Sequence, residues 1–250
     1  EEKSTGELQL SAGYSDLEGF IIQGGITQHN FRGKGQELRG NVSWSYYSKS
    51  IELGFTEPYL FDKNVAVGGD LFRRDYNAFN YIGDSRQTTY SQVSTGFQIR
   101  AGVPLTEYWS LAGRYQLSYD QVGLDQATYY TDGSCDPLKA GRYLCDSLGN
   151  RWTSSVGYSL IYSSLTGGIH PTAGTRLTFS QDFAGLGGDV KYIKTRADYA
   201  HYWGFGGGFV FSTRAEGGWI APLNNAPPGV DAVRLTDRFL LGEPQFRGFD

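Results

Sequence analysis

The sequence contains no long hydrophobic run. Among its 250 residues, no apolar stretch approaches the roughly 20 residues that a membrane-spanning helix needs, and the mean hydropathy is −0.40. Spanning helices are therefore excluded, and a hydropathy average alone would indicate a soluble protein. The average is a poor guide to strands, however, because a strand that crosses a bilayer carries polar residues at every second position.

Basic residues and histidines are also scarce. The net charge is −4, whereas nucleic-acid-binding proteins usually carry clustered Lys and Arg, so we expect no nucleic-acid partner. The three histidines, His29, His170 and His201, lie far apart in the sequence. No Ser-His-Asp or His-carboxylate spacing unites them, and we interpret them as solvated turn residues. We predict no catalytic residue, no metal site and no cofactor, and hence no enzyme.

Glycine and aromatic residues are abundant, with 35 Gly and 15% aromatics. This composition suits strands, tight turns and amphipathic rings near an interface. A strand over residues 37–46 would place Leu38, Val42, Trp44 and Tyr46 on one face and polar residues on the other. About ten alternating residues, tilted by ~45°, are long enough to span the apolar layer of a bilayer.

The same alternation returns along the whole chain. We predict eleven strands, at about residues 6–15, 20–27, 37–46, 51–57, 65–71, 92–103, 109–120, 156–162, 177–179, 193–199 and 209–219. Polar residues, including many Arg, Asp, Glu and Gln, stand opposite each apolar stripe. A large soluble sandwich or propeller remains an alternative, but it would rarely place so many charges there.

The long connections between these strands fall on one side. They are a polar loop at about 74–89, an excursion at about 121–151, and the stretch after about 221. These are the fifth, seventh and eleventh connections, and odd-numbered connections share one side of an up-and-down barrel. The even-numbered connections are short, the longest being about 164–173. The sequence therefore predicts an all-β transmembrane antiparallel up-and-down β-barrel, surrounded by outer-membrane lipids.

Both cysteines, Cys135 and Cys145, lie in the excursion at 121–151. This excursion is on the side of the long connections, which we assign to the outside. Their separation permits a disulfide that closes a small loop and stabilises it by ~2–3 kcal/mol. A metal site is the alternative, but two ligands without a nearby histidine are too few. We predict the disulfide.

Arg247 stands between aromatic residues and beside Gly248. In a wide polar barrel, a loop folded back into the lumen would bring this guanidinium against a wall carboxylate, in a charge-assisted contact that orders the loop. A solvated Arg in a flexible loop is the alternative reading.

Three segments resemble the barrel of the BamA family of outer-membrane protein assembly factors. Gln245-Phe246-Arg247-Gly248-Phe249-Asp250 is similar to the family's Val-Arg-Gly-Phe loop motif, with Phe246 in place of Val. Residues 55–61 and 170–176 resemble its Asn/Glu-Pro-Tyr-Phe and Phe-Pro-Thr-Asp-Gly-Ser-Arg turns. The three occur in the family's order, so the resemblance covers nearly the whole chain.

The resemblance implies a sixteen-stranded barrel in the cell outer membrane of a Gram-negative bacterium, preceded by periplasmic polypeptide-transport-associated repeats. Residues 1–250 would then hold strands 1 to 11 and most of the sixth extracellular loop, with the repeats and the last strands absent. The implied function is folding and insertion of β-barrel client proteins, with accessory lipoproteins as partners. The motif residues in the lumen would be Phe246, Arg247, Gly248, Phe249 and Asp250.

The first strand would form one side of an openable seam with the missing last strand. Gly6, Leu8, Leu10, Ala12 and Gly13 suit such a strand, because an unpaired edge can template an incoming strand. A secretion pore of the two-partner type, which shares the loop motif, and a passive diffusion porin are the alternative functions.

Overall fold

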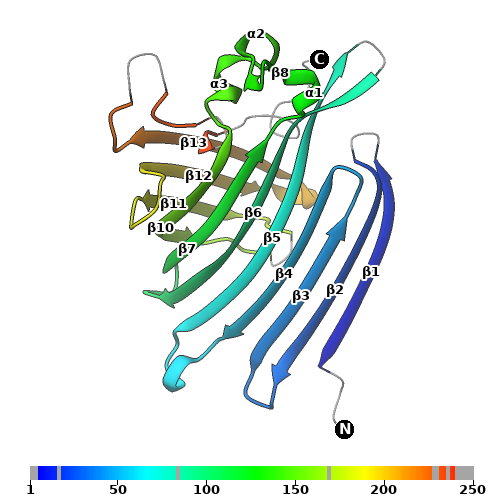
Figure 1. Cartoon of the computed structure of the whole chain (residues 1–250). Coiled ribbons are helices and arrows are strands. Elements are labelled where there is room, and N and C mark those ends of the chain that lie inside the picture. The colour runs from blue at the N-terminus through cyan, green and yellow to red at the C-terminus, as the bar shows by residue number, and fades with distance from the viewer. Residues whose placement is uncertain are drawn as a thin grey trace.

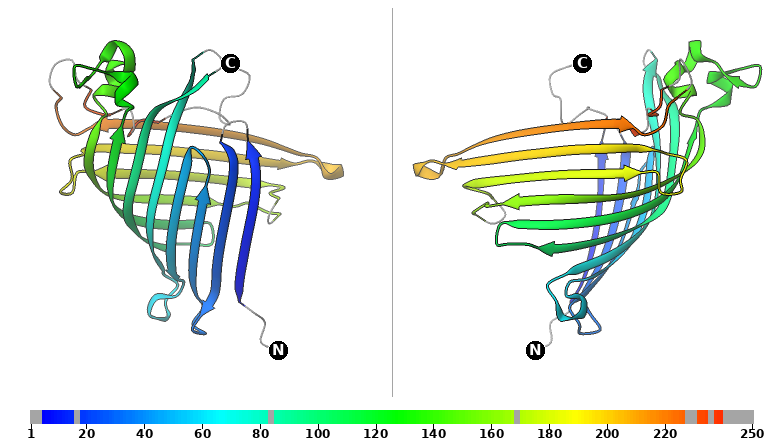
Figure 2. Two further views of the ribbon diagram at one scale, coloured as in Figure 1. Left: turned by 45° about the vertical axis from the view of Figure 1, so that its right-hand side comes forward. Right: turned by 90° about the vertical axis from the view of Figure 1, so that its left-hand side faces the viewer.

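The computed structural model describes residues 5–15, 18–82, 85–167, 170–226, 231–234 and 237–239. Eleven strands form one antiparallel sheet, in which each strand pairs with the next along the chain in the order β1-β2-β3-β4-β5-β6-β7-β10-β11-β12-β13. The sheet curves strongly (Figures 1 and 2), so that β10 to β13 run in a clearly different direction from β1 to β4. This is the all-β, up-and-down architecture that the sequence predicts.

The strands have lengths suited to crossing a bilayer. Their bounds are β1 Gly6–Ser15, β2 Gly19–Phe31, β3 Gln36–Trp44, β4 Ser48–Glu57, β5 Ala66–Ile82, β6 Ser85–Pro104, β7 Trp109–Gly123, β10 Gly149–Ser163, β11 Gly174–Ala184, β12 Tyr192–Gly204 and β13 Val210–Pro222. Short 3-10 helices, η1 Leu60–Asp62 and η2 Gly206–Gly208, lie in two of the connections. No helix in the described ranges is both long enough and apolar enough to cross a membrane.

One face of the sheet is apolar. Residues directly opposite each other in paired strands share a face, and one such row runs Ile26, Gly40, Leu53, Leu71, Phe97 and Leu117. These side chains are not packed into a core, since Ile26 is 61% exposed and Leu71 59% exposed. The exposed apolar face confirms the predicted alternation and is the surface that a transmembrane sheet turns to lipid.

The opposite face is polar and faces inward. Its side chains reach one another over intervening strands: Arg39 of β3 contacts Asp70 of β5, and Arg114 of β7 contacts Asp182 of β11. Side chains from strands that are two apart can meet in this way on the concave side of a curved sheet. We call this face the inner wall.

The predicted polar loop at 74–89 is wrong. β5 continues to Ile82 and β6 starts at Ser85, and the two pair with each other along this stretch. β4 pairs with β5 only as far as Tyr76, and β7 pairs with β6 only from Ser91 onward. The remaining parts of β5 and β6 therefore form a two-stranded ribbon that extends beyond the rest of the sheet (Figure 1). Its polar composition indicated a loop, but backbone pairing in water needs no apolar face.

The predicted excursion at 121–151 is shorter and more structured than expected. Between β7 and β10 the chain forms α1 Gln126–Tyr129, β8 Tyr130–Thr131, β9 Ser134–Cys135, α2 Pro137–Ala140 and α3 Arg142–Cys145. β8 and β9 pair only with each other. We call residues 124–148 the cap, and Figure 1 shows it at one end of the barrel wall.

A charge placed on the apolar face tests its contact with lipid. Ile99 is 51% exposed on that face, whereas Gln98 lies on the inner wall. In the membrane-inserted protein we expect Ile99→Arg to lower the free energy of unfolding by about 2–4 kcal/mol, as for charges on a lipid face. Gln98→Arg is the matched control and should cost less than 1 kcal/mol. Equal costs in urea titrations would contradict the assignment of the faces.

Candidate functional site

The inner wall carries a chain of ion pairs across β3 to β6. Arg39 Nη2 donates to Asp70 Oδ1 at 2.7 Å, and Arg100 Nη1 binds the second oxygen of the same carboxylate. Arg100 Nη2 also donates to Thr56 Oγ1 at 2.8 Å. One carboxylate therefore links cations from two strands, and four strands are tied together on their inner side.

Glycines opposite the arginines make room for this network. A Cβ at Gly54 would lie 2.6 Å from Arg39 Nε, and one at Gly68 would lie 2.9 Å from Arg100 Nε. A side chain at either position would displace the guanidinium. The side chains of Arg39 and Arg100 therefore lie against the backbone of β4 and β5.

A second cluster follows the same design. Arg114 Nε and Nη2 donate to Asp182 Oδ1 and Oδ2, each at 2.7 Å, and Nη1 donates to Ser159 Oγ at 2.7 Å. The strand between them contributes Gly157, where a Cβ would collide with the Asp182 carboxylate. The two-bond geometry fixes both side chains in orientation.

A segment from the chain beyond β13 docks on this wall. Arg151 of β10 donates from Nη1 and Nη2 to Asp237 Oδ2 and Oδ1, both at 2.8 Å. The two side chains are only 3% and 11% exposed. Burial raises the pKa of the Asp237 carboxyl, and the Arg151 guanidinium opposes that rise. The pair is the most buried ion pair in the described part of the chain. It holds the docked segment, of which residues 231–234 and 237–239 are described, against β10.

β12 and β13 hold the same segment from the other side. Lys194 Nζ donates to the Asp237 carbonyl at 3.0 Å and lies 4.5 Å from the centroid of the Phe239 ring. A Cβ at Gly218 would be 2.6 Å from Phe239 Cζ, so the ring lies directly on the β13 backbone. The Phe239 ring therefore packs between the Lys194 ammonium group and the backbone of Gly218.

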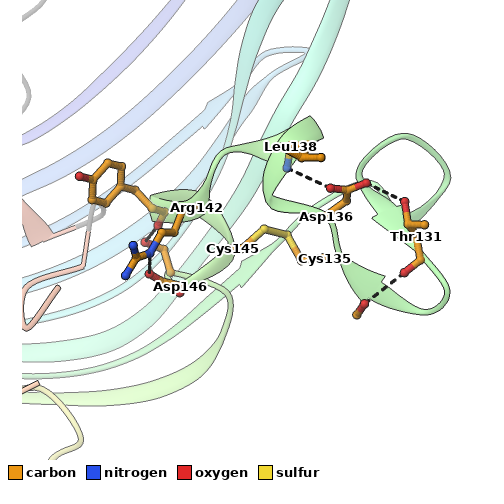
Figure 3. Close-up of a disulfide and its surroundings, with 10 residues drawn as sticks. Thr131, Cys135, Asp136, Leu138, Arg142, Cys145 and Asp146 are labelled. Carbon is orange, nitrogen blue, oxygen red and sulfur yellow. Dashed lines mark hydrogen bonds and ion pairs between the residues drawn. A yellow bond between two sulfur atoms is a disulfide. The ribbon is translucent and has the colours of Figure 1, made fainter. Parts of the chain in front are cut away.

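The cap is held together by the disulfide that the sequence predicts. Cys135 and Cys145 are bonded, with their Cα atoms 5.8 Å apart (Figure 3). Asp136 caps α2, accepting from the Leu138 amide at 2.9 Å, and also accepts from Thr131 Oγ1 at 2.8 Å. These hydrogen bonds lower the pKa of Asp136, and the one from Thr131 has the largest effect. The small loop that the disulfide closes is therefore held rigid although it has no large hydrophobic core.

The cap also contacts the docked segment. The Arg238 guanidinium lies 5.5 Å from the centroid of the Tyr143 ring of α3. Next to Tyr143, Leu144 is 6% exposed, and Val233 of the docked segment is 9% exposed. The cap, the wall and the docked segment therefore meet at one end of the sheet.

The structure places the other predicted site residues as follows. Gly6, Leu8, Leu10, Ala12 and Gly13 all lie on β1, which pairs only with β2 within the described sheet. Phe246, Arg247, Gly248, Phe249 and Asp250 lie outside the described residues, so the predicted contact of Arg247 stays a prediction. Sequence reasoning missed Arg151, Lys194, Asp237 and Phe239. The signal available was an acidic residue in the terminal loop and a cation on the inner face of each of two strands.

The histidines do not form a site. Among the described residues no group of three or more His, Cys, Asp or Glu is placed to hold a metal ion. His29 lies beside Glu37 at 3.4 Å, and His201 Nδ1 contacts Thr175 Oγ1 at 2.7 Å.

Removing the buried carboxylate should release the docked segment. We expect Asp237→Asn to weaken docking by about 3 kcal/mol, because one partner of a buried pair is lost. Limited proteolysis of the native protein should then cut within 231–239 much faster. Asp231→Asn is the control, since Asp231 binds Arg238 at a more exposed position. Equal cleavage of wild type and Asp237→Asn would show that the pair does not hold the segment.

Opening the disulfide should loosen the cap locally. We expect Cys135→Ser with Cys145→Ser to lower local stability by about 2–3 kcal/mol, seen as faster hydrogen exchange in α2 and α3. Amides of β10 serve as the internal control and should keep their protection. Unchanged exchange in α2 and α3 would mean that packing alone orders the cap.

Comparison with known proteins gives the family. Residues 30–250 match the Omp85 superfamily domain. The outer membrane protein assembly factor BamA of Neorickettsia risticii (strain Illinois) is 28% identical over 255 aligned residues, covering all of this chain and 31% of that protein. BamA of Neisseria meningitidis serogroup B (strain ATCC BAA-335 / MC58) is 33% identical over 107 residues, which are 43% of this chain and 13% of that protein.

A solved structure supports the fold. The chain resembles the crystal structure of BamA from Haemophilus ducreyi lacking POTRA domains 1-3, with a TM-score of 0.68 and 23% identity, over 88% of this chain and 42% of that one. The chain thus spans less than a third of the first relative and under half of the solved structure. Because the family domain matches all but the first 29 residues, the chain belongs to the Omp85 superfamily.

Proposed function

We propose that the protein containing this chain folds β-barrel proteins and inserts them into the bacterial outer membrane. It is an outer-membrane protein, and its partners are membrane lipids, unfolded β-barrel clients and the lipoproteins of an assembly complex. Residues 1–250 supply strands 1 to 11 and most of the sixth extracellular loop of a larger barrel. The names of its relatives support this role. The process needs neither a cofactor nor bond chemistry, because strand pairing and lipid contact supply the free energy.

The observation that carries the proposal is the position of β1. This strand ends the described sheet, and its ten residues pair with β2 along their whole length. Leu8 and Leu10 are 72% and 75% exposed. The opposite edge of β1 can therefore take a further strand, whether from the same protein or from a client, by backbone hydrogen bonds.

Small residues make that edge easy to open. A Cβ at Gly13 would meet nothing within 4 Å, and Gly6 and Ala12 likewise offer little side chain to a neighbour. Pairing there depends on the backbone more than on side-chain packing, so one strand can replace another at modest cost.

The docked segment would brace the wall from inside while the seam opens. It connects β10, β12 and β13 through Asp237 and Phe239. The motif at 246–250 would continue this contact, with Arg247 meeting a carboxylate of the wall.

Site-specific disulfide trapping tests the role of β1. We expect a client strand carrying one cysteine to be trapped in growing cells by Leu8→Cys or Leu10→Cys. Leu53→Cys is the matched control, because Leu53 is 53% exposed on the same apolar face but lies on β4, which is paired along both edges.

Client trapping at β4 as strongly as at β1, or at neither, would contradict the proposal. The porin alternative predicts no trapping at β1 together with a large steady single-channel conductance, and that pair of results would favour it. Trapping of a single exported partner in place of many clients would favour the secretion pore.

A further inference from the structure

Two cations stand on the apolar face, where a barrel usually exposes none. Register places Lys49 of β4 between Trp44 and Asp75, and it places Arg73 of β5 between Ile51 and Thr95. Both cations are exposed. A charge on a lipid-facing surface destabilises a barrel by an amount that is smallest near the interfaces. The depth of the two cations and their surroundings therefore decide how far these charges destabilise the barrel and which ligand they can bind.

The two cations lie at the depth of lipid head groups. They are near the ends of β3 and β4 that are joined by residues 45–47, at the end of the sheet that carries the cap (Figure 1). Trp44 lies opposite Lys49. In the row that contains Arg73, Tyr119 of β7 and Trp152 of β10 pack with ring centroids 4.9 Å apart. Aromatic rings of this kind mark the boundary between hydrocarbon and head groups.

Both cations line an apolar hollow. It has a volume of about 450 Å³ and is lined by Leu10, Ile22, Val42 and Ile51, with Trp44, Lys49, Arg73 and Asp75 around it. Gly24 forms part of its floor, where an added Cβ would lie 3.4 Å from Leu10 Cδ2 and 3.7 Å from Val42 Cγ2. A larger side chain at this position would therefore fill part of the hollow.

The charge around the hollow is positive. Lys49 and Arg73 outnumber Asp75, and none of the ion pairs between residues with described side chains includes either cation. Arg73 Nη1 donates to Thr95 Oγ1 at 3.0 Å, which holds the guanidinium over the sheet. Two cations above an apolar hollow match a ligand with an anionic head and a hydrocarbon tail.

We propose that this site binds one anionic phosphate lipid of the leaflet on the cap side. The phosphate lies between Lys49 and Arg73, and one acyl chain occupies the hollow over Gly24. The site touches β1 through Leu10, so the bound lipid lies beside the edge at which a further strand adds.

Lipid titration followed by native mass spectrometry tests this site on the detergent-solubilised full-length protein. The probes are phosphatidylglycerol and phosphatidylcholine with identical acyl chains. We expect Lys49→Gln with Arg73→Gln to weaken phosphatidylglycerol binding about 30-fold and to leave phosphatidylcholine unchanged, since two surface cations together contribute on the order of 2 kcal/mol. Asp75→Asn should strengthen phosphatidylglycerol binding, because it removes the opposing charge.

Lys34→Gln with Lys63→Gln is the matched control. It removes the same charge from exposed positions at the other end of the strands and should leave phosphatidylglycerol affinity unchanged. Gly24→Val should weaken binding of the lipid by filling the hollow. The proposal is overturned if the Lys49 and Arg73 double variant binds phosphatidylglycerol normally, if the control weakens binding equally, or if Gly24→Val has no effect.

Discussion

Every strand in hydrocarbon must satisfy its backbone N–H and C=O groups through neighbouring strands, because lipid tails offer no partners. In the described sheet β2 to β7 and β10 to β12 are paired on both edges, while β1 and β13 are the two ends. Continuous pairing fixes the register, and register fixes the face of each side chain. A slip of one residue in β6 would exchange Ile99 and Arg100 between lipid and lumen.

The inner wall shows how the buried charges of such a sheet are satisfied. Arginines lie flat over glycine backbone and bind carboxylates one or two strands away, as Arg114 binds Asp182 over Gly157. On β10 and β12, the docked segment supplies Asp237 to Arg151 and to Lys194. The same rule acts in both places: a desolvated charge is stable only beside its partner. The wall and the docked segment are therefore one mechanical unit.

Alternation alone predicted all eleven strands of the sheet, because a two-residue period is visible wherever one face of a strand is apolar. It failed at 74–89, where the β5–β6 ribbon stands beyond its neighbours and needs no apolar side. The disulfide followed from spacing and setting, whereas the helices of the cap carry too few residues for a periodic signal. Asp237 and Phe239 were missed because their partners, Arg151 and Lys194, come from strands far away in sequence. No local pattern encodes such a contact.

The central claim is that lipid covers one face of this sheet and water the other. Spin labels placed singly at positions 93–103 of β6 in the membrane-inserted protein test it most directly, because oxygen concentrates in hydrocarbon and a polar nickel chelate stays in water. We predict that collision rates with oxygen peak at Phe97, Ile99 and Ala101, and those with the chelate at Gln98 and Arg100. A scan without the two-residue period, or with the two sets exchanged, would contradict the account.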